Sequence, residues 1–276
     1  MKKIGITALL ATVAISSVMA ETEVNFTYTG EEGPKYWHTL STEWETCKNG
    51  LDFTQVISGQ PHQSPVDFVK NPTATVSSSF DAIDYDYEGS FLVTNNGHSI
   101  KIIPQDDQVY TITINNKEYK FLQFHLHGAS EHTEKGKHPE MEMHLVHQAD
   151  DGSYAVLGMF IDGQRISSID KKGKGRKSYD ITSNEVNEEF SKIFTEQILP
   201  KEKDQGEYTV NLNLSKIINP LMDSKIYEYE GSLTTPPCTE GVTWKVFKKH
   251  IIIPREDIQN FQEIYNFNYR PVTGEL

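Results

Sequence analysis

Hydrophobic and polar residues alternate in short segments along most of the chain, a pattern typical of half-buried β-strands. We predict six strands rich in β-branched and aromatic residues, at 90–94, 98–103, 109–114, 119–127, 140–148 and 154–161. Turn-forming pairs lie between several of them, at Asn96-Gly97, Asn115-Asn116 and Asp151-Gly152. The second and third of these turns each predict a hairpin between the flanking strands.

One segment, between Thr182 and Leu199, has helical periodicity instead. Thr182 and Glu185 have the spacing of a capping box, and Pro200 marks the end of the helix. The residues of its apolar stripe are Val186, Phe190, Ile193, Phe194 and Ile198. Because the chain shows no internal repeat and no proline-rich linker, the pattern predicts one mainly β domain with few short helices.

The first twenty residues have the pattern of a secretory signal peptide. Lys2 and Lys3 precede a mostly apolar stretch, and the small residues before Glu21 suit cleavage. The folded domain is then expected to be 21–276, and no later segment is long and apolar enough to cross a bilayer. We therefore expect a soluble, secreted protein, with the periplasm as its compartment.

The charge balance is strongly acidic. The chain has 39 acidic residues against 26 lysines and arginines, which gives a net charge of −13. Loss of Lys2 and Lys3 with the signal peptide would make it −15. Nucleic acids and anionic membranes are bound through basic patches, so neither is an expected partner.

The chain has only two cysteines, Cys47 and Cys238. In an oxidising compartment one disulfide is the most economical interpretation. It would close a loop of about 190 residues and contribute roughly 4–5 kcal/mol by the chain-entropy model, less any strain. Two free buried thiols are the alternative. A zinc–thiolate site is disfavoured because neither cysteine has a C-x-x-C partner.

Three histidines in two predicted strands carry the strongest chemical signal. His125 and His127 are two positions apart and so project from one face, and His144 lies in another strand. Gln123 and Glu142 each precede a histidine by two positions, where they can accept its second imidazole N–H. Three imidazoles with the fourth tetrahedral position open are typical of a catalytic Zn²⁺ site.

A second metal-binding fold fits part of this pattern. His125-x-His127-x-x-x-Glu131 also matches the opening motif of cupins, in which Glu131 would itself be a ligand. Cupins need a later P-x-G-x-x-H segment, whereas His144 lies in EMHLVHQ. The cupin alternative is therefore disfavoured.

Nearly the whole chain after the signal peptide resembles the α-class carbonic anhydrases. The matching segments occur in the family's order and are GPKYWHTL, SGQPHQSPVDF, NNGHS, QFHLHGASEH, EMHLVHQ, YAVLGMF, EGSLTTPPCTEGVTWKVF and NYRPV. The resemblance implies a single domain around a large, twisted, mostly antiparallel central sheet, with zinc at the bottom of a cone-shaped cleft. It also implies reversible hydration of carbon dioxide to bicarbonate and a proton through a zinc-bound hydroxide.

The resemblance also implies residue roles. The residues that match the zinc site are the ligands His125, His127 and His144 and their hydrogen-bond partners Gln123, Glu142 and Asn268. Thr234 matches a gatekeeper hydroxyl that donates to an ionised Glu131 and accepts from the hydroxide. His98 matches the proton-shuttle histidine, which an imidazole pKa near 6.5 suits. Tyr28 matches a cleft tyrosine that organises the relay waters.

Further matches concern the cleft walls. The apolar pocket for carbon dioxide would be lined by Val146, Val156, Leu233 and Trp244, which read alone would be ordinary core residues. Thr235 matches a contact of bicarbonate and inhibitors, and the two cysteines match positions paired in many secreted members. The chain departs from the family at Phe26-Thr27-Tyr28, where Trp-Gly-Tyr is usual, and at Gly128 and Gln148, which replace tryptophans.

The main rival is an inactive relative kept as a zinc-holding or binding protein. Such relatives lack a zinc histidine or the Thr–Glu pair, and this chain has all five residues. The resemblance further implies inhibition by sulfonamides and anions, and side activity on activated esters. A homodimer is expected only by analogy with bacterial members, since no interface can be derived from the residues.

Overall fold

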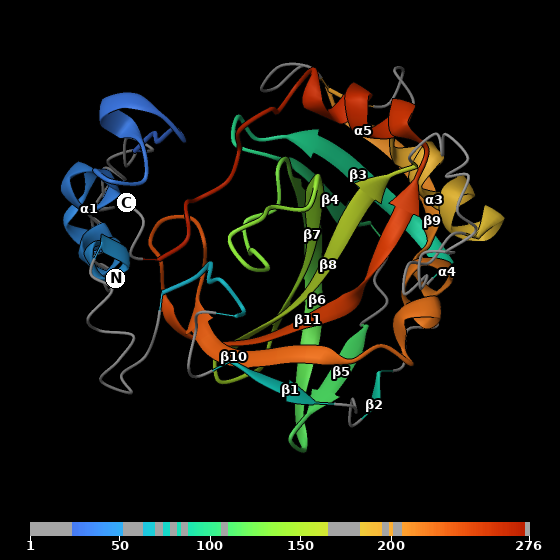
Figure 1. Cartoon of the computed structure of the whole chain (residues 1–276), viewed down its shortest axis with the longest axis horizontal. Coiled ribbons are helices and arrows are strands. Elements are labelled where there is room, and N and C mark those ends of the chain that lie inside the picture. Colours follow the sequence, from blue (N-terminus) through green and yellow to red (C-terminus); the bar gives the residue numbers. More distant parts are fainter. Residues whose placement is uncertain are drawn as a thin grey trace, which may run out of the picture.

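A large twisted β-sheet dominates the computed structural model (Figure 1). The structure describes residues 24–51, 63–69, 74–77, 82–83, 88–105, 110–164, 183–194, 199–200 and 206–273. Its strands are β1 (Thr75–Ser77), β2 (Ala82–Ile83), β3 (Glu88–Asn95), β4 (Ile100–Pro104), β5 (Thr111–Ile114), β6 (Lys117–His127), β7 (Met141–Gln148), β8 (Tyr154–Gly163), β9 (Tyr208–Asn213), β10 (Ile226–Ser232) and β11 (Glu240–Ile253). The signal peptide predicted at 1–20 lies outside the described residues.

The described strands form one sheet in the order β1-β10-β11-β8-β7-β6-β4-β3-β9, while β5 pairs with β6 and β2. Every pair is antiparallel except β8 with β11, which run parallel. The predicted fold class, a mainly β domain with a mostly antiparallel central sheet, is confirmed. Both predicted hairpins are present, as β5–β6 around Asn115-Asn116 and as β7–β8 around Gly152.

The six predicted strands correspond to β3 through β8, with small shifts at their ends. One shift of two residues is at β4, which begins at Ile100 instead of His98. The side-chain oxygen of Asn96 accepts hydrogen bonds from the backbone N–H groups of His98 and Ser99, so this stretch forms a turn. His98 is therefore presented from a loop beside the sheet.

Short helices complete the fold. The helical elements are η1 (Gly30–Glu32), α1 (Trp37–Leu40), η2 (Thr42–Leu51), α3 (Asn184–Phe194), α4 (Leu214–Ile218), η3 (Asn219–Leu221) and α5 (Arg255–Gln262). The predicted long helix is confirmed as α3, and the hydroxyl of Ser183 accepts from the Val186 N–H at its start. Thr182 and residues 195–198 lie outside the described residues. None of the described helices has the length and apolar character needed to cross a membrane.

The two faces of the sheet have different coverings. Helices α3, α4 and α5 pack together on one face, at the right of Figure 1, where α3 contacts β9 and α5 contacts β8. The main core lies between these helices and the sheet and includes Phe124, Leu126, Met143 and Leu145. On the other face a smaller cluster contains Val146, Val156 and Trp244. The alternating residues of β6 and β7 therefore divide between a helix-covered core and an opposite face.

A bulge in β6 sets which residues reach that opposite face. Phe121 is opposite His147 in β7, but Gln123 is opposite Val146, so Leu122 is an extra residue in the ladder. Tyr119 and Phe121 point into the core before the bulge, and Phe124 and Leu126 do so after it. Because the phase shifts by one residue, Gln123, His125 and His127 share the face away from the helices.

Candidate metal centre and cleft

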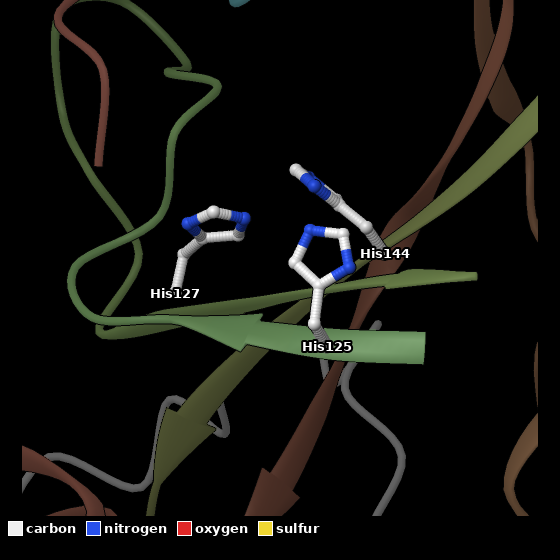
Figure 2. Close-up of side chains that lie close together, drawn as sticks. All are labelled: His125, His127 and His144. Carbon is white, nitrogen blue, oxygen red and sulfur yellow. The ribbon is translucent and has the colours of Figure 1, made fainter. Parts of the chain in front are cut away.

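Three imidazoles converge on the open face of the sheet. His125 and His127 extend from β6, and His144, which is opposite His125 in the strand register, extends from β7 (Figure 2). The ring centroids are 4.7–5.3 Å apart, and one nitrogen from each ring lies within 4.8 Å of the others. The predicted trio is therefore brought together with the spacing of a possible metal site.

Hydrogen bonds to the outer ring nitrogens identify the inner nitrogens available to a metal. The Nδ1 atom of His127 is 2.6 Å from the Asn268 carbonyl oxygen, which can only accept, so Nδ1 carries the proton. The buried Nε2 of His127 has no hydrogen-bond partner among the described residues. In His125, Nδ1 is 3.0 Å from the Gln123 side-chain oxygen, which leaves Nε2 facing inward. Both predicted outer partners, Gln123 and Asn268, are in place.

His144 has the opposite orientation. Its Nε2 lies 2.9 Å from Oε1 of Glu142, within ion-pair distance but not aligned as a hydrogen bond, so Nδ1 faces the other two rings. Burial by itself would raise the pKa of Glu142, but the nearby charges of His132 and His144 and the hydrogen bond with His132 outweigh it and hold that pKa well below its usual range. An ionised Glu142 favours a proton on the near nitrogen of His144 and a lone pair on Nδ1.

The electrostatics of His125 and His127 favour neutral rings. Burial lowers the pKa of His125 well below its usual value, and the charges of His127, His144 and Lys101 lower it further. Burial also lowers the pKa of His127, against an opposing effect of Glu131. Neutral imidazoles keep the lone pairs that a metal needs. With three inward nitrogens and no other described use for His127 Nε2, the site fits a tetrahedral metal with one position open.

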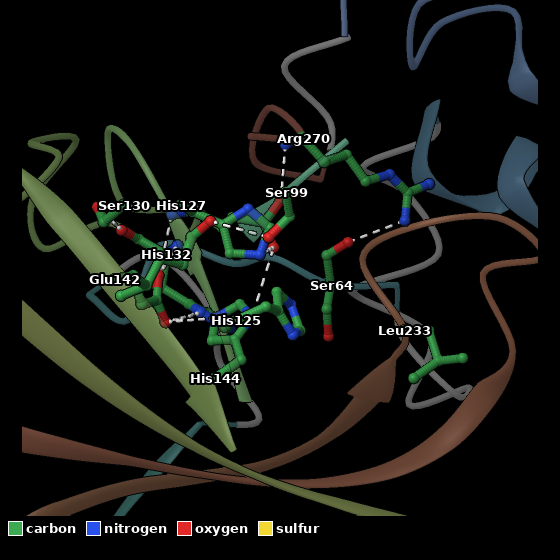
Figure 3. Close-up of polar contacts among 12 residues, drawn as sticks. Ser64, Ser99, His125, His127, Ser130, His132, Glu142, His144, Leu233 and Arg270 are labelled. Carbon is green, nitrogen blue, oxygen red and sulfur yellow. Dashed lines mark hydrogen bonds and ion pairs between the residues drawn. The ribbon is translucent and has the colours of Figure 1, made fainter. Parts of the chain in front are cut away.

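A second group of possible ligands, His132, Glu142 and His144, lies beside the first. Both nitrogens of His132 are already used, since Nδ1 is 2.8 Å from Glu142 Oε1 and Nε2 is 2.5 Å from the Tyr229 hydroxyl. The other Glu142 oxygen accepts from the backbone N–H groups of Glu131 and His132 (Figure 3). This group is therefore a closed hydrogen-bond network that supports the trio.

Glu131 is wholly buried and lies next to the trio. Its Oε1 accepts from the backbone N–H of Arg270, while its Oε2 lies 3.4 Å from His127 Nε2. The resemblance implies a hydrogen bond to Glu131 from the Thr234 hydroxyl, but Oε2 has no hydrogen-bond partner among the described residues. The buried Thr234 lines the cleft in front of the trio, so an acceptor oxygen and the proposed donor are present without the bond between them.

A cavity of about 370 Å³ lies in front of His125 and His144. One wall is apolar and contains each residue predicted for the carbon dioxide pocket, namely Val146, Val156, Leu233 and Trp244. Thr234, Thr235, His125 and His144 line the same cavity. The structure thus brings these predicted residues together around one space that is apolar on one side and polar beside the imidazoles.

A neighbouring cavity of about 230 Å³ contains the remaining predicted residues. Tyr28 and His98 line it together with His125, His127 and Thr235. The His98 ring stacks on Phe26 with centroids 3.7 Å apart and planes 7° from parallel. Phe26 occupies a position where the family usually has tryptophan, and it therefore contacts His98, the predicted proton-shuttle residue.

The Tyr28 hydroxyl is buried and has no hydrogen-bond partner among the described residues. Burial raises the pKa of Tyr28 well above its usual value, and the charges of Glu131 and Tyr265 raise it further. The phenol is therefore protonated at any physiological pH. A neutral hydroxyl in this position is able to hydrogen-bond water in the cavity it lines.

The predicted disulfide is confirmed. Cys47 and Cys238 are bonded across 191 residues of sequence, with their Cα atoms 5.1 Å apart. The Arg270 guanidinium lies beside the bridge and donates to the Cys47 carbonyl, the Gln63 side chain and the Ser64 carbonyl. Since the Arg270 backbone also holds Glu131, the disulfide and the buried carboxylate are joined through one residue.

The departure at Gly128 has a steric explanation. A Cβ atom there would lie 3.0 Å from the Tyr265 carbonyl oxygen and 3.2 Å from the Phe261 ring. A side chain at this position would therefore require the Tyr265 backbone or the Phe261 ring to shift by a few tenths of an ångström. Neither Gly128 nor Gln148 is a hydrogen-bond partner of the trio.

Sequence reasoning missed three residues that shape the site. His132 follows Glu131 directly, and a third histidine in the QFHLHGASEH segment was the available signal. Arg270 follows Asn268 by two positions in NYRPV, and a buried role could not be inferred from an arginine alone. Lys101 lines both cavities, and nothing in the strand pattern distinguishes it from a surface lysine.

The fold and site together define a β-sheet protein with three converging imidazoles that could hold a metal ion. The family model for eukaryotic-type carbonic anhydrase matches residues 32–273. The chain therefore belongs to the α-carbonic anhydrase family.

Individual relatives agree with this assignment. The chain is 32% identical to a carbonic anhydrase of Klebsiella pneumoniae over 253 residues, which cover 90% of this chain and 87% of the relative. It is 31% identical to a carbonic anhydrase of Neisseria gonorrhoeae, with 96% and 90% covered. Among solved structures, the α-carbonic anhydrase of Thermovibrio ammonificans in complex with sulfanilamide is 30% identical, with a TM-score of 0.69 and coverage of 90% and 95%.

Proposed function

We propose that this protein is a zinc-dependent carbonate dehydratase that hydrates carbon dioxide reversibly to bicarbonate and a proton. The observation that carries the proposal is the inward set of nitrogens, Nε2 of His125, Nε2 of His127 and Nδ1 of His144, at the end of a half-apolar cavity. When bound there, zinc supplies a nucleophile at neutral pH by acidifying water, an effect for which carbonic anhydrase is itself the reference case.

The cavity walls have complementary roles in the proposed reaction. Carbon dioxide is apolar, and it would bind against Val146, Val156, Leu233 and Trp244 beside the trio. The Thr234 hydroxyl would orient the nucleophile by donating to the buried Oε2 of Glu131 and accepting from the reacting oxygen. Glu131 has no other described partner for that oxygen, which leaves it available to fix the direction of the Thr234 proton. Thr235 would contact bicarbonate.

The proton would leave through the second cavity. His98 lines this cavity with His125 and His127, and an imidazole exchanges protons efficiently near neutral pH. Water between His98 and the trio would carry the proton, with the neutral Tyr28 hydroxyl as an ordering partner. Stacking on Phe26 would keep the His98 ring at the edge of this cavity.

The disulfide supports a location in an oxidising compartment, as proposed from the signal sequence at 1–20. The sulfanilamide complex of the Thermovibrio ammonificans relative supports sulfonamides as inhibitors of this protein as well. Zinc content and stopped-flow carbon dioxide hydration with a pH indicator test the central proposal. We expect about one zinc per chain and a hydration rate far above buffer. Zinc-loaded protein with no such rate would favour the inactive, zinc-holding alternative.

The His98→Ala variant tests the proposed proton route separately. Turnover should fall about tenfold or more in dilute buffer, as is typical for loss of a general acid–base group, and should recover when imidazole is added. The rate per bound zinc at high buffer concentration should remain close to that of the unsubstituted protein. Insensitivity of the variant to buffer concentration would show that the proton leaves by another route.

A further inference from the structure

Lys101 is the one lysine or arginine among the described residues that line either cavity. It lies in β4, opposite His125 in the strand register, and it lines both cavities. Within the described ranges of the chain, no aspartate or glutamate lines either cavity. The position between the two cavities is therefore positively charged in a chain whose net charge is −13.

The charge of Lys101 is not neutralised within the described part of the chain. Lys117 and Lys120 on the neighbouring strand each pair with an aspartate, and Lys245 pairs with Glu228. No carboxylate of the described residues lies within ion-pair distance of Lys101. An unpaired ammonium beside a partly desolvated cavity attracts anions more strongly than an exposed one does.

We propose that Lys101 is an anion-docking residue, whose ammonium group holds bicarbonate and other small anions in the cleft beside His125. This role rests on the proposed function, because bicarbonate is the charged partner in that reaction. Carbon dioxide carries no charge and does not respond to this field to first order. Lys101 therefore acts on the ionic side of the reaction and on anionic inhibitors, while the apolar wall acts on carbon dioxide.

Thiocyanate titration of the cobalt(II)-loaded protein, followed by visible absorption, measures anion binding without turnover. Lys101→Gln should raise the thiocyanate Kd about fivefold, the size expected for one charge several ångströms away in a hydrated cleft. Lys101→Arg should keep the Kd within about twofold of the original because it keeps the charge. Bicarbonate titrated in the same way should show the same order of affinities.

The matched control is Lys120→Gln, which removes one positive charge from the neighbouring strand β6. Lys120 pairs with Asp150 and lines neither cavity, so its loss should leave the thiocyanate Kd unchanged. Sulfanilamide, which enters the cleft uncharged, should bind all three variants with similar affinity. This second ligand verifies that the metal centre is intact in each protein.

The outcomes separate the two proposals. An unchanged thiocyanate Kd in Lys101→Gln, with cobalt and sulfanilamide still bound, would overturn the docking role and leave the proposed function standing. An equal loss of affinity in Lys120→Gln would also overturn it, since the effect would then come from net charge. Failure of the unsubstituted protein to bind cobalt or sulfanilamide would overturn the proposed function and the docking role together.

Discussion

Two buried polar clusters lie side by side under the cleft. They differ in whether both nitrogens of each imidazole ring contact a partner in the protein. In the closed cluster, both nitrogens of His132 are hydrogen-bonded, to Glu142 and Tyr229, and Tyr229 bonds in turn to Ser64. In the open cluster, His125, His127 and His144 use one nitrogen each on an outer partner and turn the other inward. The two clusters share Glu142.

The difference distinguishes a candidate functional site from buried polar groups that only support the fold. Buried polar groups are normally satisfied, and each exception needs an explanation. The unpartnered Nε2 of His127 and Oε2 of Glu131 are both buried and lie 3.4 Å apart. Such atoms are costly unless a ligand completes them. The open cluster therefore fits the metal site proposed above, while the closed cluster has its imidazole nitrogens satisfied within the protein.

The largest expected effect comes from breaking the open cluster. His127→Gln removes an inward nitrogen, so zinc affinity should fall by more than the roughly 10–100-fold typical for loss of an outer partner. Carbon dioxide hydration should drop to the buffer rate. Zinc analysis after dialysis and stopped-flow assays measure both effects. Retention of one tightly bound zinc would contradict the assignment of His127 as a ligand.

Removal of the disulfide tests how far the Cys47–Cys238 bridge, which lies beside Arg270, stabilises the fold around the two clusters. Arg270 connects the Cys47 carbonyl to Glu131, which borders both clusters. The Cys47→Ser, Cys238→Ser double variant should lose about 4–5 kcal/mol of unfolding free energy, the chain-entropy value for a loop of this length. Urea unfolding of the metal-free protein measures the loss. The same stability in both proteins would show that the bridge is not a stabilising element.

The closed cluster itself is tested by His132→Ala. This change leaves buried groups of Glu142 and Tyr229 without a partner, so the metal-free protein should lose about 2–4 kcal/mol of unfolding free energy. Zinc affinity should fall about 10–100-fold, because Glu142 also supports His144. His127→Gln should show the reverse pattern, with the larger effect on zinc and the smaller one on unfolding. Equal effects of the two variants on both measurements would remove the distinction between the clusters.

The sequence predicted the open cluster well because strand alternation is a local property. His125 and His127 share a face at any register, and Gln123 and Glu142 follow from the same rule. Which face of the sheet this would be was not predictable, because the bulge at Leu122 shifts the phase of β6 relative to its earlier residues. A bulge depends on how two strands pair, and nothing in the segment KFLQFHLH predicts one.

The closed cluster was largely invisible in the sequence. Tyr229, Ser64 and Arg270 approach His132 and Glu131 from segments far apart in the chain, and only tertiary structure brings them together. The roles of Thr234, His98 and Tyr28 came from family resemblance, and the structure adds that His98 and Tyr28 line one cavity and Thr234 lines the other. The role proposed for Lys101 was also not predictable from the sequence. It depends on which described residues line the two cavities, and no described carboxylate is among them.

The smallest expected effect concerns a third cluster, which is nearer the surface. His250 lies 2.7 Å from Asp162 and 3.6 Å from Glu134. Burial by itself would lower its pKa, but the hydrogen bonds and charges of these two carboxylates raise the pKa of His250 to about 9. Unlike His125 and His127, whose pKa values are lowered, His250 is therefore held charged.

A raised pKa in the folded state stabilises the fold below the unfolded value near 6.5, and this contribution disappears as pH rises through about 9. Unfolding of the His250→Gln variant beside the unsubstituted protein, from pH 6 to pH 10, measures it. The difference in unfolding free energy should be about 2 kcal/mol near pH 6, allowing for the partial exposure of the two carboxylates, and should fall toward zero by pH 10. A difference that is constant across this range would show that His250 stabilises the fold by packing and not by charge.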